Sequence, residues 1–208
     1  MTRYGMAIDV NRCVACNACV TGCKIENNLP QGVWWNRVVN EGGENPDSPA
    51  GTYDKQDLKM SSYTLACQHC SNPACVAVCP SGAAHVDEET GIVLGDPDKC
   101  IGCSMCLEAC PYGVRVMQEG EPVYYADFGF GAAGAPKHVA NTVQKCTLCH
   151  HRVTKGDVPF CVEVCPGRAR VFGDLDDPES DISKLVAART VEQLKTDAGT
   201  EPNVYLLR

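Results

Sequence analysis

The chain lacks the features of a membrane-spanning or exported polypeptide. No apolar run in its 208 residues reaches the roughly 18 residues that a transmembrane helix needs. The N-terminal stretch MTRYGMAIDV contains neither the apolar region of a signal peptide nor a twin arginine. We therefore expect no direct membrane span and no export address in this chain itself.

Basic clusters and the common catalytic signatures are also missing. There are 18 Lys and Arg against 26 Asp and Glu, and the net charge is −8. No basic cluster is available to neutralise phosphates, which excludes a nucleic-acid partner. The chain has no P-loop, no Rossmann glycine fingerprint and no Ser–His–Asp signature. We expect no catalytic site within the chain.

Ordinary apolar residues are few once cysteine is set aside. The hydrophobic content of 44% includes 16 cysteines, and without them the apolar core is thin for a chain of this length. The fold is therefore expected to need an inorganic core.

The cysteines repeat in a pattern typical of iron–sulfur proteins. In the stretch CIGCSMCLEACP, Cys100, Cys103 and Cys106 are three residues apart, Cys110 follows four residues later, and proline comes next. This is the run that binds [4Fe–4S] clusters in bacterial ferredoxins, where the fourth cysteine ligates the other cluster of a pair. Cys110 lies one helical turn beyond Cys106, so it is directed toward a second cluster.

Four such quartets account for every cysteine, and they predict four [4Fe–4S] clusters. The first three quartets are CVACNACVTGCK, CQHCSNPACVAVCP and the stretch above, and the fourth is CTLC with CVEVCP. The second and third quartets are adjacent in sequence and form the natural pair, which leaves the first with the fourth. The expected ligand sets are Cys13, Cys16, Cys19 and Cys165; Cys146, Cys149, Cys161 and Cys23; Cys67, Cys70, Cys75 and Cys110; and Cys100, Cys103, Cys106 and Cys79.

The expected fold class is α+β, with two ferredoxin-like modules, each built round a pair of clusters, and an intertwined chain. Residues 1–60 with 142–208 form one module, and residues 61–141 are inserted as the other. Each quartet should be followed by a short helix that begins near its third cysteine. Strands are expected in the segments RYGMAIDV, VWWNRVVN, MSSYTLA, GVRVMQ, RARVFGDL and NVYLLR, a hairpin in HVDEETGIVL, and a surface helix in DISKLVAAR.

Other interpretations fit these residues less well. Structural zinc sites join two separated CxxC pairs and have no use for a fourth cysteine followed by proline. Cys146 to His150 matches the attachment pattern of c-type haem, but haem there would leave Cys161 and Cys165 without their partners. Disulfide stapling belongs to secreted chains. The histidines are interpreted as bystanders, with His150 and His151 on the surface. The aromatic segment 119–141 is either a surface loop or a partner-docking segment.

The sequence resembles the four-cluster iron–sulfur subunits of complex molybdopterin oxidoreductases, which include the dimethyl sulfoxide, polysulfide, thiosulfate and arsenate reductases. The resemblance covers nearly the whole chain, from GMAIDVNRCVACNACVTGCK to PFCVEVCPGRARVFGDLDDPES. It implies the same four ligand sets. Because Cys103 occupies the position that is Trp in nitrate reductase subunits, it also implies four [4Fe–4S] clusters.

The resemblance implies a component of an oxidoreductase complex in anaerobic respiration. Such subunits relay electrons between a membrane quinol or quinone subunit and a large molybdopterin catalytic subunit. Many are exported already folded with that large subunit, so we expect a membrane-associated complex on the extracytoplasmic side, with the cytoplasmic side as the alternative. Two other functions stay open, the cluster subunit of a membrane hydrogenase and a free polyferredoxin.

Overall fold

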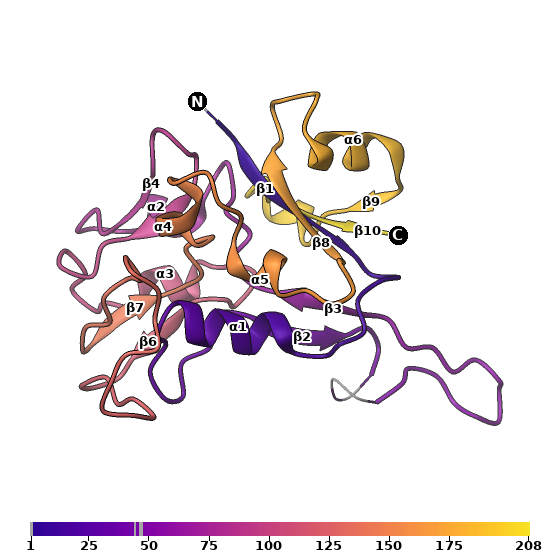
Figure 1. Cartoon of the computed structure of the whole chain (residues 1–208), viewed down its shortest axis with the longest axis horizontal. Coiled ribbons are helices and arrows are strands. Elements are labelled where there is room, and N and C mark those ends of the chain that lie inside the picture. Colours follow the sequence, from indigo (N-terminus) through magenta and orange to yellow (C-terminus); the bar gives the residue numbers. More distant parts are fainter. Residues whose placement is uncertain (1, 44, 46–47) are drawn as a thin grey trace.

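The computed structural model describes residues 2–43, 45 and 48–208, in which a four-stranded sheet joins the two ends of the chain. Strand β1 (Tyr4–Asp9) pairs antiparallel with β8 (Arg170–Asp174) and parallel with β10 (Val204–Leu207) (Figure 1). The other side of β10 pairs antiparallel with β9 (Val191–Glu192). Met6 lies opposite both Phe172 and Val204 in this register. The first and last quartets are therefore held by one sheet.

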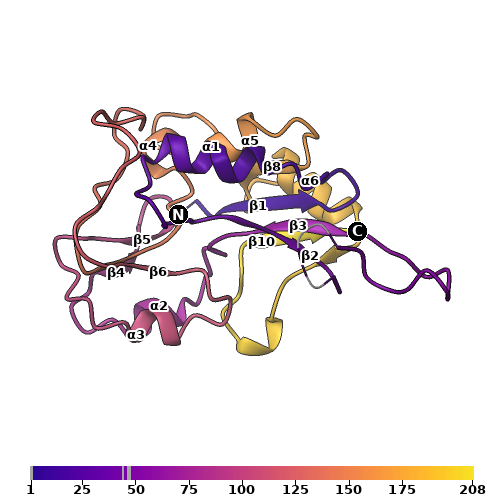
Figure 2. The ribbon, with the colours of Figure 1, turned by 90° about the horizontal axis from the view of Figure 1, so that it is seen from below.

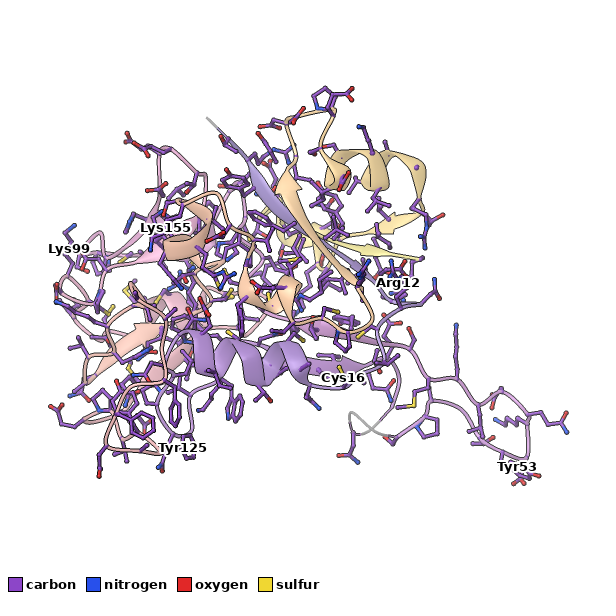
Figure 3. The ribbon with its side chains drawn as sticks, viewed as in Figure 1. Arg12, Cys16, Tyr53, Lys99, Tyr125 and Lys155 are labelled. Carbon is purple, nitrogen blue, oxygen red and sulfur yellow. The ribbon has the colours of Figure 1, made fainter. Side chains whose placement is uncertain are left out.

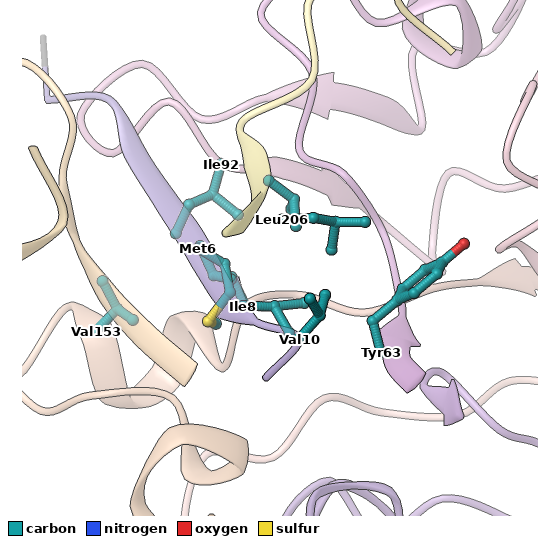
Figure 4. Close-up of a cluster of buried hydrophobic side chains, with 9 residues drawn as sticks. Met6, Ile8, Val10, Tyr63, Ile92, Val153 and Leu206 are labelled. Atoms are coloured by element: carbon teal, nitrogen blue, oxygen red, sulfur yellow. The ribbon is translucent and has the colours of Figure 1, made fainter. Parts of the chain in front are cut away.

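The alternation of side chains along β1 gives this sheet two buried faces. Met6 and Ile8 point into the main hydrophobic core, together with Leu206 of β10 (Figure 4). Ala7 points to the opposite face and packs in a second core with Leu207. The first face is the one that contributes walls to the cysteine-lined cavities described below.

Helix α6 (Asp181–Ala188) covers the second face of the sheet. The side chain of Ser180 caps its N-terminus by accepting a hydrogen bond from the backbone N–H of Ser183 at 3.2 Å. Ile182 is fully buried, and its Cγ2 lies 3.0 Å from where a Cβ on Gly173 would sit. Helix and sheet are thus in close contact, and a larger residue at position 173 would push them apart.

Truncation of Ile182 should destabilise this part of the fold. Ile182→Ala leaves a cavity between α6 and the sheet, and we expect a loss of about 2–5 kcal/mol in the free energy of unfolding. Lys184→Ala on the same helix removes only a surface ion pair with Glu179, with an expected cost below about 1 kcal/mol. Denaturant unfolding of the iron-loaded protein without oxygen measures both values. Equal effects would contradict the packing described here.

Three short antiparallel pairs make up the rest of the strands. Two of these pairs cross the module boundaries expected from the sequence. Strands β2 and β3 pair although the expected boundary after residue 60 separates them, and β6 and β7 pair although the expected boundary after residue 141 separates them. Boundaries that keep these pairs whole would fall after Leu65 and after Gln144. The pairs are β2 (Arg37–Asn40) with β3 (Ser62–Leu65), β4 (Ala84–Val86) with β5 (Val93–Gly95), and β6 (Val116–Gln118) with β7 (Thr142–Gln144).

The short helices pack in two pairs. Helix α1 (Ala18–Glu26) contacts α5 (Phe160–Glu163), and α2 (Ala74–Ala77) contacts α3 (Met105–Glu108). Figure 2 shows the first pair on one side of the strands and the second pair on the other. Each helix begins one residue before the third cysteine of its quartet, as expected. The chain also forms helix α4 (His150–Val153) and the 3₁₀ turn η1 (Thr196–Ala198), of which only the turn was not expected. None of the helices in the described residues is long and apolar enough to cross a membrane.

The two long connections expose apolar side chains. Tyr53 is 82% exposed at the tip of the excursion that follows β2, where a single bridge pairs Ala50 with Lys59 (Figure 3). In segment 119–141, Tyr125 and Phe128 are also exposed, and the side chain of Tyr125 lies beside the Lys24 ammonium at 5.3 Å. The second connection therefore lies against α1.

Candidate metal centres

Four cavities in the structure are lined by cysteine, and each brings together one of the four expected sets. We name them by the order in which they lie along the molecule. The volume not occupied by protein atoms is about 390 Å³ in cavity I, 540 Å³ in cavity II, 350 Å³ in cavity III and 400 Å³ in cavity IV. Cavity I is lined by Cys13, Cys16, Cys19 and Cys165; II by Cys23, Cys146, Cys149 and Cys161; III by Cys67, Cys70, Cys75 and Cys110; and IV by Cys79, Cys100, Cys103 and Cys106.

Neighbouring cavities share parts of their walls, which sets their order. Arg170 lines both I and II, Cys67 lines both II and III, and Arg115 lines both III and IV. Cys16 in cavity I and Cys103 in cavity IV are the two exposed cysteines. In Figure 3, Cys16 and Lys99, which precedes Cys100, are well separated along the long axis. The four sites therefore form a line whose two ends reach the surface.

A left-handed residue shapes every one of the four cysteine loops. Two residues after the first cysteine of each quartet, φ is +54° at Ala15, +43° at His69, +68° at Gly102 and +55° at Leu148. Only one of the four is glycine, and the conformation is costly for the other three. Sequence reasoning missed this shared turn, because residues other than glycine rarely adopt it.

Backbone N–H groups are aimed at the sulfur atoms as a result of these turns and of the loops after the helices. Leu148 N–H donates to Cys146 Sγ at 3.3 Å, Ala84 N–H to Cys79 Sγ at 3.3 Å, and Ala169 N–H to Cys165 Sγ at 3.3 Å. Such donors stabilise thiolate over thiol, and they raise the potential of a cluster bound to that sulfur.

The packing of α1 on α5 brings cysteines of two different quartets into one cavity. Cys23 lies on α1 and Cys161 on α5, and both line cavity II. The two helices approach closely at Gly22, where a Cβ would meet Val164 Cγ2 at 2.9 Å. A side chain at position 22 would therefore separate two of the cysteines that share a cavity.

Burial of the thiols raises their pKa in the absence of iron. The pKa of Cys146 is raised to about 12 and that of Cys149 to about 11, in both cases mainly by burial. Burial likewise raises the pKa of Cys70 to about 11. These groups are thiols at neutral pH when no metal is bound. Iron binding must release their protons, and higher pH favours assembly.

Three buried cations lie among the cysteines. Lys145 is 3% exposed, Arg170 is 7% and Arg115 is 8%, and none of them forms an ion pair with a carboxylate of the described residues. Lys145 Nζ donates to the carbonyl oxygens of Val93 and Cys146. Buried cations are stable only with compensating negative charge, and the sulfur atoms are the anions at hand.

The histidines have structural positions. His69 is 1% exposed, burial lowers its pKa, and neither ring nitrogen has a hydrogen-bond partner in the described part of the chain. His151 corrects the expectation of a surface residue: its Nε2 lies 3.0 Å from Glu26 Oε1, and its side chain is 9% exposed. The carboxylate at the end of α1 turns it inward, a long-range contact that the sequence does not reveal.

The donor set fits iron–sulfur clusters. All sixteen cysteines are free thiols, each cavity contains one complete set of four, and thiolate is the ligand that [4Fe–4S] clusters take. Among the described residues, no three His, Cys, Asp or Glu side chains are gathered as they would be round a single metal ion. The fold and these sites define the chain as an iron–sulfur protein of the ferredoxin-like class.

Comparison with known proteins identifies the family. A family described as "4Fe-4S dicluster domain" matches residues 58–124 and 134–175. The chain belongs to this family, among the iron–sulfur subunits of molybdopterin oxidoreductases. Like its relatives, it is an electron-transfer subunit of a reductase complex and works with a catalytic partner.

Three relatives illustrate the similarity. A Halobacterium salinarum protein named as an iron–sulfur subunit of dimethyl sulfoxide reductase is 46% identical over 100% of this chain and 79% of its own length. The arsenate respiratory reductase iron–sulfur subunit of a Shewanella species is 37% identical over 99% of this chain and 96% of its own length. A selenate reductase subunit of Mesobacillus selenatarsenatis is 39% identical over 97% of this chain and 70% of its own length.

Proposed function

We propose that the chain holds four [4Fe–4S] clusters, one in each cavity, each ligated by the expected set of four cysteines in the lining of that cavity. The observation that carries this proposal is that four separate cavities each contain one complete predicted set. When bound, the clusters supply one-electron redox chemistry. The residues of the chain fix their spacing and donate N–H groups to their sulfur ligands.

The proposed relay runs through the cavities in the order I, II, III, IV, in either direction. This order is supported by the residues that line two successive cavities, because they show that each cavity adjoins the next. The exposed cysteines Cys16 and Cys103 mark the ends where electrons would enter and leave. By analogy with the family, cavity I faces the catalytic subunit.

Two ferredoxin-like modules remain the proposed domain organisation, each with two clusters. One contains residues 1–60 and 142–208, and the other residues 61–141, with the boundaries shifted as the strand pairs require. The packing of α1 on α5 and of α2 on α3 supports this division, because each helix pair carries the cysteines of one module.

The proposed partners are a large molybdopterin catalytic subunit and an integral membrane anchor that exchanges electrons with quinone. The relatives' names support a reductase of an oxidised inorganic or organic acceptor, such as dimethyl sulfoxide, arsenate, selenate or tetrathionate. We further propose an extracytoplasmic location, reached by co-export with the catalytic subunit.

Metal analysis of the native complex tests the partner. The complex would be isolated without oxygen through this chain, in mild detergent. Molybdenum or tungsten with abundant iron is the expected result. Nickel would indicate a hydrogenase instead, and iron alone, with no large partner, would indicate a free polyferredoxin and contradict the proposal.

Single cysteine replacements test the ligand sets. Cys165→Ala should remove the same paramagnetic signal as Cys13→Ala, and about four of sixteen irons, because both residues line cavity I. Cys146→Ala, in cavity II, should remove a different signal. Electron paramagnetic resonance of the three reduced variants gives the comparison. If Cys165→Ala and Cys146→Ala lose the same signal, the proposed sets are wrong.

A further inference from the structure

One guanidinium is buried between the two cavities of each pair. Arg170 is the one charged residue that lines both cavity I and cavity II within the described chain, and Arg115 is the one residue of any kind that lines both III and IV. Each therefore lies within reach of two sites at once. Their places in the sequence show only that each follows a quartet, not that it lies between cavities.

The two arginines occupy equivalent positions. Each follows the last cysteine of its quartet by five residues, Arg115 after Cys110 and Arg170 after Cys165. In the first and second quartets the same position is Asn28 or Ala84. The chain thus supplies one arginine for each pair of cavities, rather than one for each cavity.

Their contacts identify sulfur as the counter-charge. Arg115 Nη2 donates to Cys75 Sγ at 2.8 Å in cavity III. Arg170 Nη1 donates to the hydroxyl of Thr64, and its Nε has no hydrogen-bond partner in the described residues. A guanidinium stays charged at any relevant pH, and a buried one without an anion is strongly unfavourable. Thiolates and the clusters they bind are the anions that face these two groups.

We propose that Arg115 and Arg170 are shared countercations, each raising the reduction potentials of both clusters in its pair. A cluster gains one negative charge on reduction, and a nearby buried cation favours that more negative form. Because each guanidinium borders two cavities, it acts most strongly on the two clusters there, and its effect on the more distant pair is weaker. The proposal rests on the four clusters proposed above.

Redox titration of the anaerobic, iron-loaded complex tests this. In Arg170→Gln the potentials of the clusters in cavities I and II should both fall, and those in III and IV should change much less. Arg115→Gln should give the converse pattern. Arg170→Lys and Arg115→Lys keep the charge and should restore most of each shift. Arg12→Gln is the matched control, because Arg12 lines cavity I alone, is exposed, and is screened by solvent.

Several results would overturn the proposal. With iron content and all four signals intact, a shift in one cluster only, an equal shift in all four, or no shift would each do so. If a Gln variant fails to assemble clusters, assembly becomes the readout. The variant with Lys at that position should then assemble four clusters, whereas the variants with the uncharged Gln or Met should not. A Met variant that assembles four clusters at unchanged potentials, or a Lys variant that fails to assemble them, would count against a role for charge. A native complex without four clusters would instead contradict the proposed function.

Discussion

Removal of iron should unfold most of this chain. Without clusters, Arg115 and Arg170 lose their counter-charge, and each uncompensated buried cation costs about 3–5 kcal/mol. Together these costs are comparable with the whole stability of a typical domain, about 5–15 kcal/mol. The apolar cores are small, with nine buried members in the main core and three, Ala7, Ile182 and Leu207, in the second.

When a chelator removes iron from the reduced protein in the absence of oxygen, we expect the protein to lose hydrogen-exchange protection and circular dichroism signal. Protection should be lost first in the cysteine loops and last in β1 and β10, whose hydrogen bonds do not depend on a cavity. A mock-treated sample in the same buffer is the control. Retention of protection in the loops round Cys67 and Cys146 would show that the fold stands without metal.

Replacement of Cys67 should interrupt electron transfer between the two ends of the chain. Cys67 is a proposed ligand in cavity III and also part of the wall of cavity II, so it lies where the two proposed modules meet. In Cys67→Ala the cluster of cavity III should be missing. Reductase activity with a quinol donor should fall to the level of a complex without this chain, because the remaining sites are too far apart.

Rapid-freeze spectroscopy of the variant complex measures where the electrons stop. The clusters on the donor side should be reduced at the normal rate, and those beyond the gap should stay oxidised. Ser71→Ala is the control in the same loop, because Ser71 contacts Asn203 and lines none of the four cavities. Normal transfer in a chain shown to lack one cluster would mean that the route bypasses cavity III.

Sequence patterns predicted the local elements well. The strands at β1, β3, β8 and β10, the hairpin of β4 and β5, and the helices at the third cysteines all lie where the segments indicated. Cysteine spacing and hydrophobic alternation act over a few residues, so these elements could be recognised without tertiary information. Strand β7 was missed because it has no apolar pattern of its own and forms only by pairing with β6.

The sequence by itself determined the chemistry of this protein. Sixteen cysteines at ferredoxin spacing specify thiolate ligands for iron–sulfur clusters, whose chemistry is one-electron transfer. Only the tertiary structure decided the order of the cavities, the inward turn of His151 toward Glu26, and the burial of Arg115 and Arg170 between paired sites. These features are contacts between residues far apart in the chain, and they depend on how α1 packs on α5 and how the sheet joins both ends, which no local spacing encodes.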